Sequence, residues 1–139
     1  MQIQSLHPAF IMPTKASEKA GAYDIYMPEA GTADGTSRMI GLGFATAIPD
    51  GYVALLLPRS SSGAKHGLEL NNTCGVIDSD YRGEWKAAIK TKSGLPFQWA
   101  AGDRILQFLL VPVATVRLDL VESLAETNRG IGGFGSTGQ

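Results

Sequence analysis

The chain has little cysteine and histidine, with one cysteine, Cys74, and two histidines among its 139 residues. A single cysteine forms no internal disulfide, and a reducing compartment is compatible with that usage. No cysteine and histidine have the spacing of metal ligands, which argues against a metal held directly by such side chains. These features predict a cytoplasmic protein.

The chain also lacks an excess of either charge and any long hydrophobic run. Twelve Lys and Arg against thirteen Asp and Glu give a formal net charge of −1, which provides no basic field for a nucleic-acid polymer. The longest apolar run, residues 105–116, is too short to cross a bilayer and is interrupted by Gln107 and Pro112. The N-terminus has no basic region followed by an apolar core. We therefore expect neither a nucleic-acid polymer nor a membrane as partner.

What is present is a hydrophobic content of 44% and seventeen glycines, which fits one compact domain with a single core. Short apolar or alternating runs are separated by turn residues, as at 31–37 and 49–51. The predicted strands are residues 2–10, 23–27, 39–48, 52–57, 84–91, 97–99 and 104–123. Many strands without βαβ alternation indicate an all-β fold of the barrel or jelly-roll type.

Three of these runs carry more specific expectations. The continuous run 52–57 predicts a strand buried on both faces, and the run 104–123 a long strand kinked near Pro112. In the run 84–91, alternation places Trp85, Ala87 and Ile89 on one buried face. Within the apolar run that starts at residue 104, Arg104 and Gln107 are the polar exceptions, and each needs a partner if it is buried.

Residues 71–83, with the sequence NNTCGVIDSDYRG, are the candidate site. Gly75 is expected to allow a positive φ or a close approach to a ligand, and Val76 and Ile77 to bury an edge, so that Asp78 has a fixed position. One interpretation is a hairpin turn with solvated carboxylates, or carboxylates paired with Arg82. The other is a hairpin whose amides hold a planar ligand while Asp78 acts as a base on a water molecule.

Two further segments allow both a structural and a functional interpretation. In PRSSSGAKHG, Ser60 caps a short helix that ends at Gly67, and its first amides beside Arg59 suit a phosphate, although an ordinary capped turn has the same pattern. The last residues, RGIGGFGSTGQ, are too rich in glycine to pack a core. They form either a simple mobile terminus or a segment that closes over a ligand. A Walker-type phosphate loop is excluded because no Gly-Lys-Ser/Thr is present.

Five segments occur in order along nearly the whole chain: AGAYDIY, PRSSSGAKHG, NNTCGVIDSDYRG, GDRILQ and RGIGGFGSTG. This pattern resembles the five motifs of the trimeric dUTPases. The resemblance implies a homotrimer of distorted jelly-roll subunits, each with a barrel domain over residues 1–128 and a flexible arm over 129–139. It also implies active sites at the subunit interfaces, hydrolysis of dUTP to dUMP and pyrophosphate, and Mg²⁺ bound to the triphosphate instead of directly to the protein.

The resemblance implies a role for individual residues. Asp78 matches the carboxylate that deprotonates the water attacking the α-phosphorus, and Tyr81 matches the aromatic residue that packs under the deoxyribose. Water molecules of the Mg²⁺ shell would be held by Asp24 and Gln107. The uracil edge would be read by Asn72, Gly75, Val76 and Ile77. The remaining substrate-binding positions are Arg59, Ser60, Ser61 and Lys86 in the barrel, Gln107 again, and Arg129, Phe134, Gly135, Ser136 and Thr137 in the arm.

Within the arm, Phe134 matches the ring that covers the uracil, while Arg129, Ser136 and Thr137 match contacts to the γ-phosphate. Two positions depart from the family pattern. Ser61 stands where the second motif usually has glycine, and Ile131 where the fifth motif commonly has glutamate. The resemblance gives no source, so the cytoplasm would be that of the host cell if the protein comes from a phage or a virus.

Two rival functions are compatible with parts of the pattern. The related dCTP deaminases share an Arg-Ser-Ser element but need a further glutamate as proton shuttle, where this chain has Ala88 between Lys86 and Lys90. A non-catalytic nucleotide sensor would keep the pocket without the reaction. The intact Asp78 and the intact arm favour an enzyme.

Overall fold

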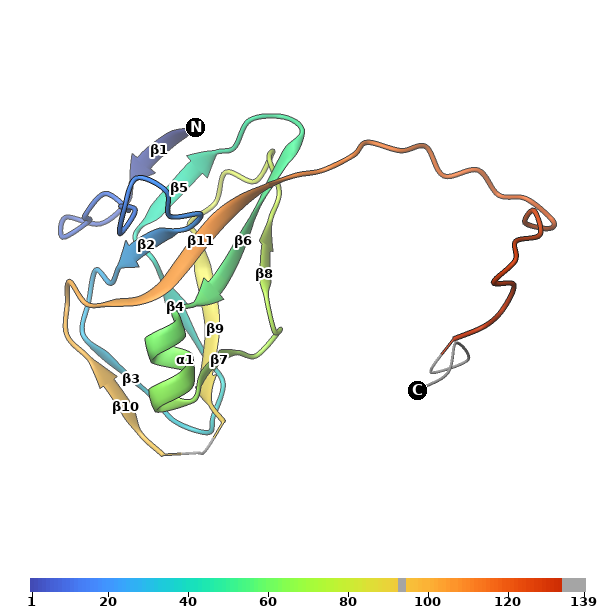
Figure 1. The fold of residues 1–139 in the computed structure, drawn as a ribbon. Helices are drawn as coiled ribbons and strands as arrows, with labels where there is room; N and C mark the ends of the chain where they lie inside the picture. Colours follow the sequence, from blue (N-terminus) through green and yellow to red (C-terminus); the bar gives the residue numbers. More distant parts are fainter. Residues whose placement is uncertain (93–94, 134–139) are drawn as a thin grey trace.

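The computed structural model describes residues 1–92 and 95–133 (Figure 1). In these ranges eleven strands and one short helix form a β structure, which confirms the all-β prediction. The elements are β1 (Gln2–Ser5), β2 (Tyr23–Tyr26), β3 (Gly31–Ala33), β4 (Arg38–Gly41), β5 (Phe44–Ala47), β6 (Tyr52–Pro58), α1 (Ser60–His66), β7 (Leu68–Leu70), β8 (Gly75–Ile77), β9 (Lys86–Thr91), β10 (Phe97–Trp99) and β11 (Arg104–Pro112).

The strands pair antiparallel in four small sheets. The largest has the order β2-β11-β6-β8, the second the order β4-β9-β7, and the pairs β1-β5 and β10-β3 complete the body. The longest strand, β11, occupies the middle of the main sheet between β2 and β6. This arrangement is consistent with the predicted jelly-roll-like fold.

The core forms where the alternating faces of these sheets meet. Trp85 is fully buried, its ring lies 5.0 Å from that of Phe44 and 5.1 Å from that of Phe108, and its Nε1 donates to Thr46 Oγ1 at 3.1 Å. Burial of one such aromatic side chain contributes about 3 kcal/mol to folding. The prediction that Trp85, Ala87 and Ile89 share a buried face is confirmed, although the strand itself starts at Lys86.

The predicted strand 39–48 is wrong as a single element. It divides at Leu42 and Gly43, where Gly43 has a φ of 77° that no extended strand accommodates. β4 then pairs with β9, and β5 pairs with β1. The break lets one continuous run of sequence supply strands to two sheets.

Three other expectations need correction. The predicted loop 31–37 begins with β3, which pairs with β10. The predicted strand 2–10 ends at Ser5. The run 52–57 is not buried on both faces, because Ala54 and Leu56 are fully buried while the alternate Val53, Leu55 and Leu57 are half-buried.

Between β3 and β4, a tight turn is closed by Asp34. Its carboxylate accepts a hydrogen bond from the backbone N–H of Thr36 at 2.8 Å and one from Arg38 at 2.9 Å. The Thr36 amide and then Arg38 hold the pKa of the Asp34 carboxyl below its usual value. The Asp34 carboxylate therefore stabilises this turn.

The chain leaves the body after Pro112. The predicted strand 104–123 ends there, and residues 113–131 are exposed along an extended segment (Figure 1). Leu118, Leu120 and Leu124 are between 87% and 102% exposed. These three leucines have the apolar character of a strand but pair with no strand among the described residues. The body of the isolated subunit therefore ends before the predicted boundary at residue 128. That boundary stays a prediction for the assembled protein.

Candidate active site

The stretch 71–83 begins as a loop between two sheets instead of a hairpin of two paired strands. β7, before it, pairs with β9, whereas β8 pairs with β6. The loop is fixed by backbone hydrogen bonds from Asn71 N to Ala88 O at 2.8 Å, from Thr73 N to Leu70 O at 2.9 Å and from Cys74 N to Asn72 O at 2.7 Å. Asn72 is exposed at its tip, where it is free to meet a ligand.

Gly75 allows β8 and β6 to approach each other closely. The positive φ in this stretch falls on Thr73, at 66°, and not on Gly75. A Cβ at Gly75 would lie 3.0 Å from the Cβ of Leu56, to which Gly75 is registered on β6. The neighbouring Val76 is 60% exposed, so the expectation that it buries an edge is wrong for the single chain, and Ile77 is half-buried.

Asp78 follows β8 directly and is exposed. Its carbonyl oxygen accepts from the N–H of Tyr81 at 3.2 Å, which closes a turn and leaves the carboxylate accessible. Arg82 donates to the carbonyl oxygens of Ser79 at 2.6 Å and Tyr81 at 3.1 Å. These contacts do not support the interpretation in which Arg82 pairs with the carboxylates of the stretch.

A second group of polar side chains lies at the junction of β2, β6 and β11. Asp24 on β2 has only 7% of its side chain exposed, and its two oxygens contact Arg59 Nε at 2.9 Å and Arg104 NH1 at 3.3 Å. Arg59 also donates to the carbonyl oxygen of Arg104 at 3.0 Å. Two cations around one buried carboxylate leave a local excess of positive charge, which suits an anionic ligand.

Gln107 belongs to the same group. It faces Asp24 across the β2-β11 pair and Leu57 across the β6-β11 pair, and its Nε2 donates to Pro58 O at 3.0 Å. The predicted residues Asp24, Arg59 and Gln107 are therefore brought together. Arg104, expected from the sequence as a polar exception and as a structural or electrostatic support, is registered with Tyr26 and reaches Asp24 only through its side chain, at 3.3 Å.

The helix α1 begins one residue earlier than expected, because the N-cap is Arg59 and not the predicted Ser60. Arg59 occupies the N-cap with extended φ and ψ of −69° and 150° and no side-chain cap bond, and Ser60 is the first helical residue. Ser60 and Ser61 are exposed beside Arg59, whereas Ser62 is buried. The predicted stop at Gly67 is confirmed, with a φ of 65°.

The two groups lie at opposite ends of β6. Ile77 is registered to Ala54 near the start of β6, so Asp78 is level with Val53, whereas Arg59 follows the last residue of the strand. At about 3.3 Å per residue, Asp78 and Arg59 are about 20 Å apart along the strand. The two groups therefore do not form one compact site within a single chain.

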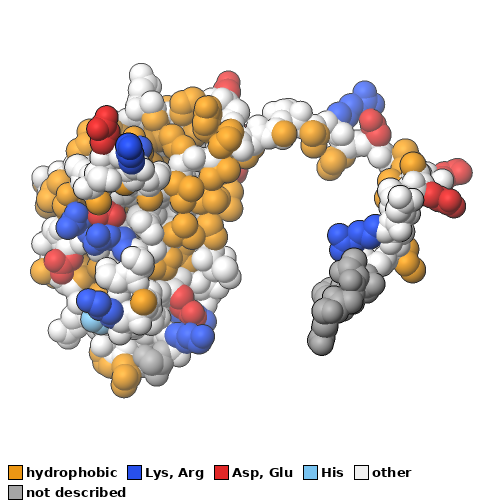
Figure 2. Space-filling view, in the orientation of Figure 1, with side chains coloured by type: hydrophobic (Ala, Val, Ile, Leu, Met, Phe, Trp, Pro, Cys, Tyr) orange, Lys and Arg blue, Asp and Glu red, His pale blue; other side chains and the backbone are white. Residues whose placement is uncertain are grey.

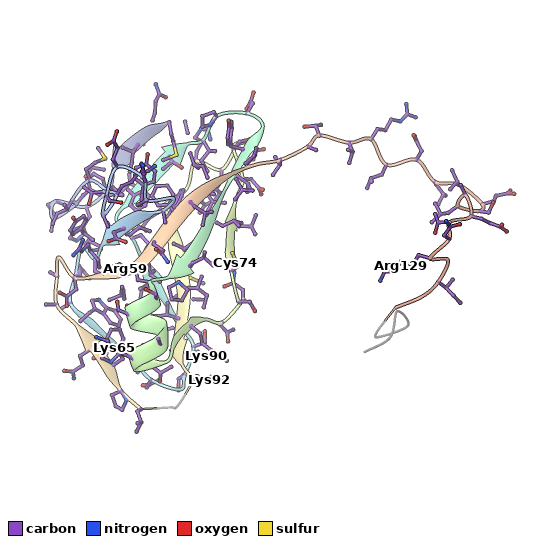
Figure 3. All side chains as sticks on the ribbon, in the orientation of Figure 1. Arg59, Lys65, Cys74, Lys90, Lys92 and Arg129 are labelled. Carbon is purple, nitrogen blue, oxygen red and sulfur yellow. The ribbon has the colours of Figure 1, made fainter. Side chains whose placement is uncertain are left out.

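The other predicted residues lie apart from both groups. Lys86 is exposed at the start of β9, opposite Gly41. Arg129 is on the extended segment far from the body, where its Nε donates to Gly132 O at 3.0 Å (Figure 3). Phe134, Gly135, Ser136 and Thr137 lie outside the described residues.

Residues 1–92 and 95–133 contain no group of three or more His, Cys, Asp or Glu that could hold a metal ion. No helix in these ranges is long and apolar enough to cross a membrane. At the polar group around Asp24, both carboxylate oxygens already contact Arg59 and Arg104, so the described residues there form no direct protein cage for a divalent ion.

Comparison with known proteins gives the same assignment along the whole chain. A sequence model of the dUTPase family matches residues 9–138. The chain belongs to the dUTPase family. The deoxyuridine 5'-triphosphate nucleotidohydrolase of Wolinella succinogenes is 39% identical over 140 residues, covering all of this chain and 94% of the relative. That of Idiomarina loihiensis is 45% identical over 106 residues, or 76% of this chain and 70% of the relative.

Solved dUTPases have the same fold. The dUTPase of Staphylococcus bacteriophage 80alpha with dUPNHPP has a TM-score of 0.89 at 28% identity, covering 99% of this chain and 98% of the phage chain. A mutant dUTPase from phage phi11 of S. aureus, described as revealing the coordination of a structural Mg(II) ion, has a TM-score of 0.79 at 26% identity, covering 88% and 96%. Both polar groups thus lie on a dUTPase framework.

Proposed function

We propose that this protein hydrolyses dUTP to dUMP and pyrophosphate, which limits uracil incorporation into DNA and supplies dUMP for thymidylate synthesis. The observation that carries the proposal is the exposed carboxylate of Asp78, placed by β8 at the end of the family's third motif. A carboxylate at this place can act as a general base and accept the proton of a water that attacks the α-phosphorus.

The active site is assembled from different chains of a homotrimer. The separation of Asp78 from Arg59 along β6 supports this, because one nucleotide needs both groups. Apolar side chains gather on the side of the body from which the extended segment leaves (Figure 2). The exposed Tyr52, Val76 and Val113 would be covered in an assembly of this kind.

At the phosphate end, Arg59, Ser60 and Ser61 bind the triphosphate. The buried Asp24 holds the Arg59 guanidinium in place through Nε, and NH1 donates to the carbonyl oxygen of Arg104, so the triphosphate would be met by NH2. When bound, Mg²⁺ neutralises charge on the triphosphate, and Asp24 and Gln107 orient its water molecules. Lys86 adds a positive charge to the substrate-binding surface.

At the nucleoside end, the loop 71–75 and β8 read the base. Backbone amides around Gly75, Val76 and Ile77, with Asn72, fit the hydrogen-bonding edge of uracil. Cytosine would leave these hydrogen-bonding groups of the protein unpaired. The methyl group of thymine would clash with the wall of the narrow slot. Tyr81 packs under the deoxyribose and excludes a ribose 2'-hydroxyl.

The arm 129–139 closes over the bound nucleotide. Phe134 and Gly135 cover the uracil, and Arg129, Ser136 and Thr137 contact the γ-phosphate. Ending the chain after Asn128 should leave a folded trimer whose activity is lower by about 100-fold or more, because positioning of the triphosphate supplies much of the rate. Light scattering would verify the trimer, and steady-state kinetics the loss. A fully active truncated protein would contradict the role of the arm.

The reaction is tested by measuring pyrophosphate release from dUTP, dCTP, dTTP and UTP, with and without Mg²⁺, while chromatography identifies the products. We expect conversion of dUTP to dUMP that depends on Mg²⁺, with little reaction of the other three. Deamination of dCTP would mean that Ala88 does not exclude the deaminase reaction. Binding of dUTP without turnover would instead favour a nucleotide sensor.

A further inference from the structure

The side chain of Tyr81 lies directly over the backbone of Gly83. A Cβ built at Gly83 would lie 2.4 Å from the Tyr81 hydroxyl oxygen, 2.7 Å from Cζ and 3.1 Å from Cε2. Real Cβ atoms do not come closer than 3.0 Å to such neighbours. Gly83 is not among the residues with positive φ, so the requirement for glycine here is one of space and not of backbone conformation.

The tip of the Tyr81 ring is held by Glu84. The Tyr81 hydroxyl donates to the carbonyl oxygen of Glu84 at 3.0 Å. The Glu84 carboxylate in turn accepts from the backbone N–H of Gly43 at 3.1 Å, at the break between β4 and β5. A Cβ at Gly41 would lie 2.4 Å from the same carboxylate, so Glu84 is closely confined on that side as well.

Glu84 is fixed to the core through the next residue. The N–H of Trp85 donates to Phe44 O and the carbonyl oxygen of Trp85 accepts from Leu42 N, each at 2.9 Å. Trp85 itself is fully buried. Tyr81, although 43% exposed, is therefore tied to the core in two steps, by contact with Gly83 and by its hydroxyl on Glu84.

We propose that Gly83 and Glu84 are positioning residues that determine the selection of deoxyribose over ribose, by fixing the ring of Tyr81 before a nucleotide binds. This inference rests on the proposed function, in which Tyr81 packs against the sugar. A ring that can yield would move aside for a 2'-hydroxyl, whereas a ring that is already fixed rejects it by contact. The selection thus depends on a residue that contributes no side chain.

The test replaces Gly83 by alanine in the full-length protein and measures kcat and KM for dUTP and UTP. We expect the ratio of kcat/KM for UTP to that for dUTP to rise by about tenfold, a change of the size that small steric differences produce. The kcat for dUTP should stay within about threefold, since Asp78 and the phosphate contacts are unaltered. If Gly83 had a purely structural role, the substitution would instead lower kcat/KM for dUTP and for UTP by the same factor.

Gly21→Ala is the matched control. Gly21 is exposed, has no positive φ, and a Cβ there meets nothing within 4 Å, so both substrates should react as in the wild type. Tyr81→Phe is a second variant, which keeps the ring and removes only the bond to Glu84. It should raise the same ratio by a smaller factor, and it decides the question if Gly83→Ala does not fold.

Tyr81→Ala separates the two possible failures. If removal of the ring leaves the preference for dUTP unchanged, the proposed role of Tyr81 is wrong. If Tyr81→Ala relaxes the preference but Gly83→Ala and Tyr81→Phe both leave it at the wild-type value, the fixing of the ring by Gly83 and Glu84 is overturned. A raised ratio in Gly83→Ala with an unchanged Gly21→Ala supports the inference.

Discussion

Replacing Asp78 by asparagine is expected to lower kcat for dUTP by about 100-fold to 10,000-fold, the range for loss of a general base. Asparagine has nearly the same shape but cannot accept the proton of the attacking water. The Asp78 side chain is exposed and follows β8 directly, and within residues 1–92 and 95–133 its carboxylate has no hydrogen bond or ion pair that the substitution would break. Single-turnover kinetics would measure the loss, and calorimetry with a non-hydrolysable imido analogue of dUTP would verify that binding is kept.

Asp80→Asn provides the matched control for this substitution. Asp80 is an exposed carboxylate in the same turn, two residues further on. Its replacement by asparagine removes the same charge from the same surface. We expect its kcat to stay near the wild-type value. If Asp80→Asn were as inactive as Asp78→Asn, the effect would come from the charge of the loop, and Asp78 would lose its assignment as the base.

The second large effect is expected from mixing two inactive variants. Asp78→Asn chains lack the base, and Arg59→Gln chains lack the guanidinium while keeping a donor for the buried Asp24. Because Asp78 and Arg59 lie at opposite ends of β6, each complete site would take them from neighbouring chains. In trimers assembled at random from equal amounts of both variants, about a quarter of the sites would contain both native residues.

Co-expression with two different tags would provide the mixed trimers, and tandem affinity purification would isolate them. We expect activity to rise from near zero in either variant alone to about a third of the wild-type value, because the purification removes trimers of a single variant and one site in each mixed trimer is complete. The baseline is Asp78→Asn co-expressed with a chain that carries both substitutions, because no such trimer contains a complete site. Mixed trimers that stay at this baseline would show that each site is built within one chain.

How far the sequence predicts the fold depends on whether a segment's partners are local. The strand β9 was predictable because its residues alternate between apolar and polar. The end of α1 was predictable because Gly67 is a residue that readily adopts a positive φ. The break at Gly43 was not, since the run around it is apolar throughout. Likewise β3 has a turn-rich sequence and becomes a strand only because β10 lies beside it.

The site shows the same division. Residues close together in sequence, such as Asp78 and Tyr81, could be assigned together. The contact of Asp24 with both Arg59 and Arg104 could not, because it depends on the register of three strands. The alternation of residues 23–27 placed Asp24 and Ile25 on opposite faces of the strand. It did not indicate that both faces are buried in the folded chain. In the proposed homotrimer, the position of the arm 129–139 would depend on neighbouring chains, about which the pattern of one chain gives no information.

The distance between the two ends of β6 also has a genetic consequence. If each site takes Asp78 from one chain and Arg59 from another, a chain that has lost both residues disables sites on two sides of itself. A cell that makes such a chain together with the normal one would then lose more activity than the share of defective protein. Loss of both residues from one chain is therefore expected to have a dominant effect, and such a co-expressed chain would serve as an inhibitor of the normal enzyme.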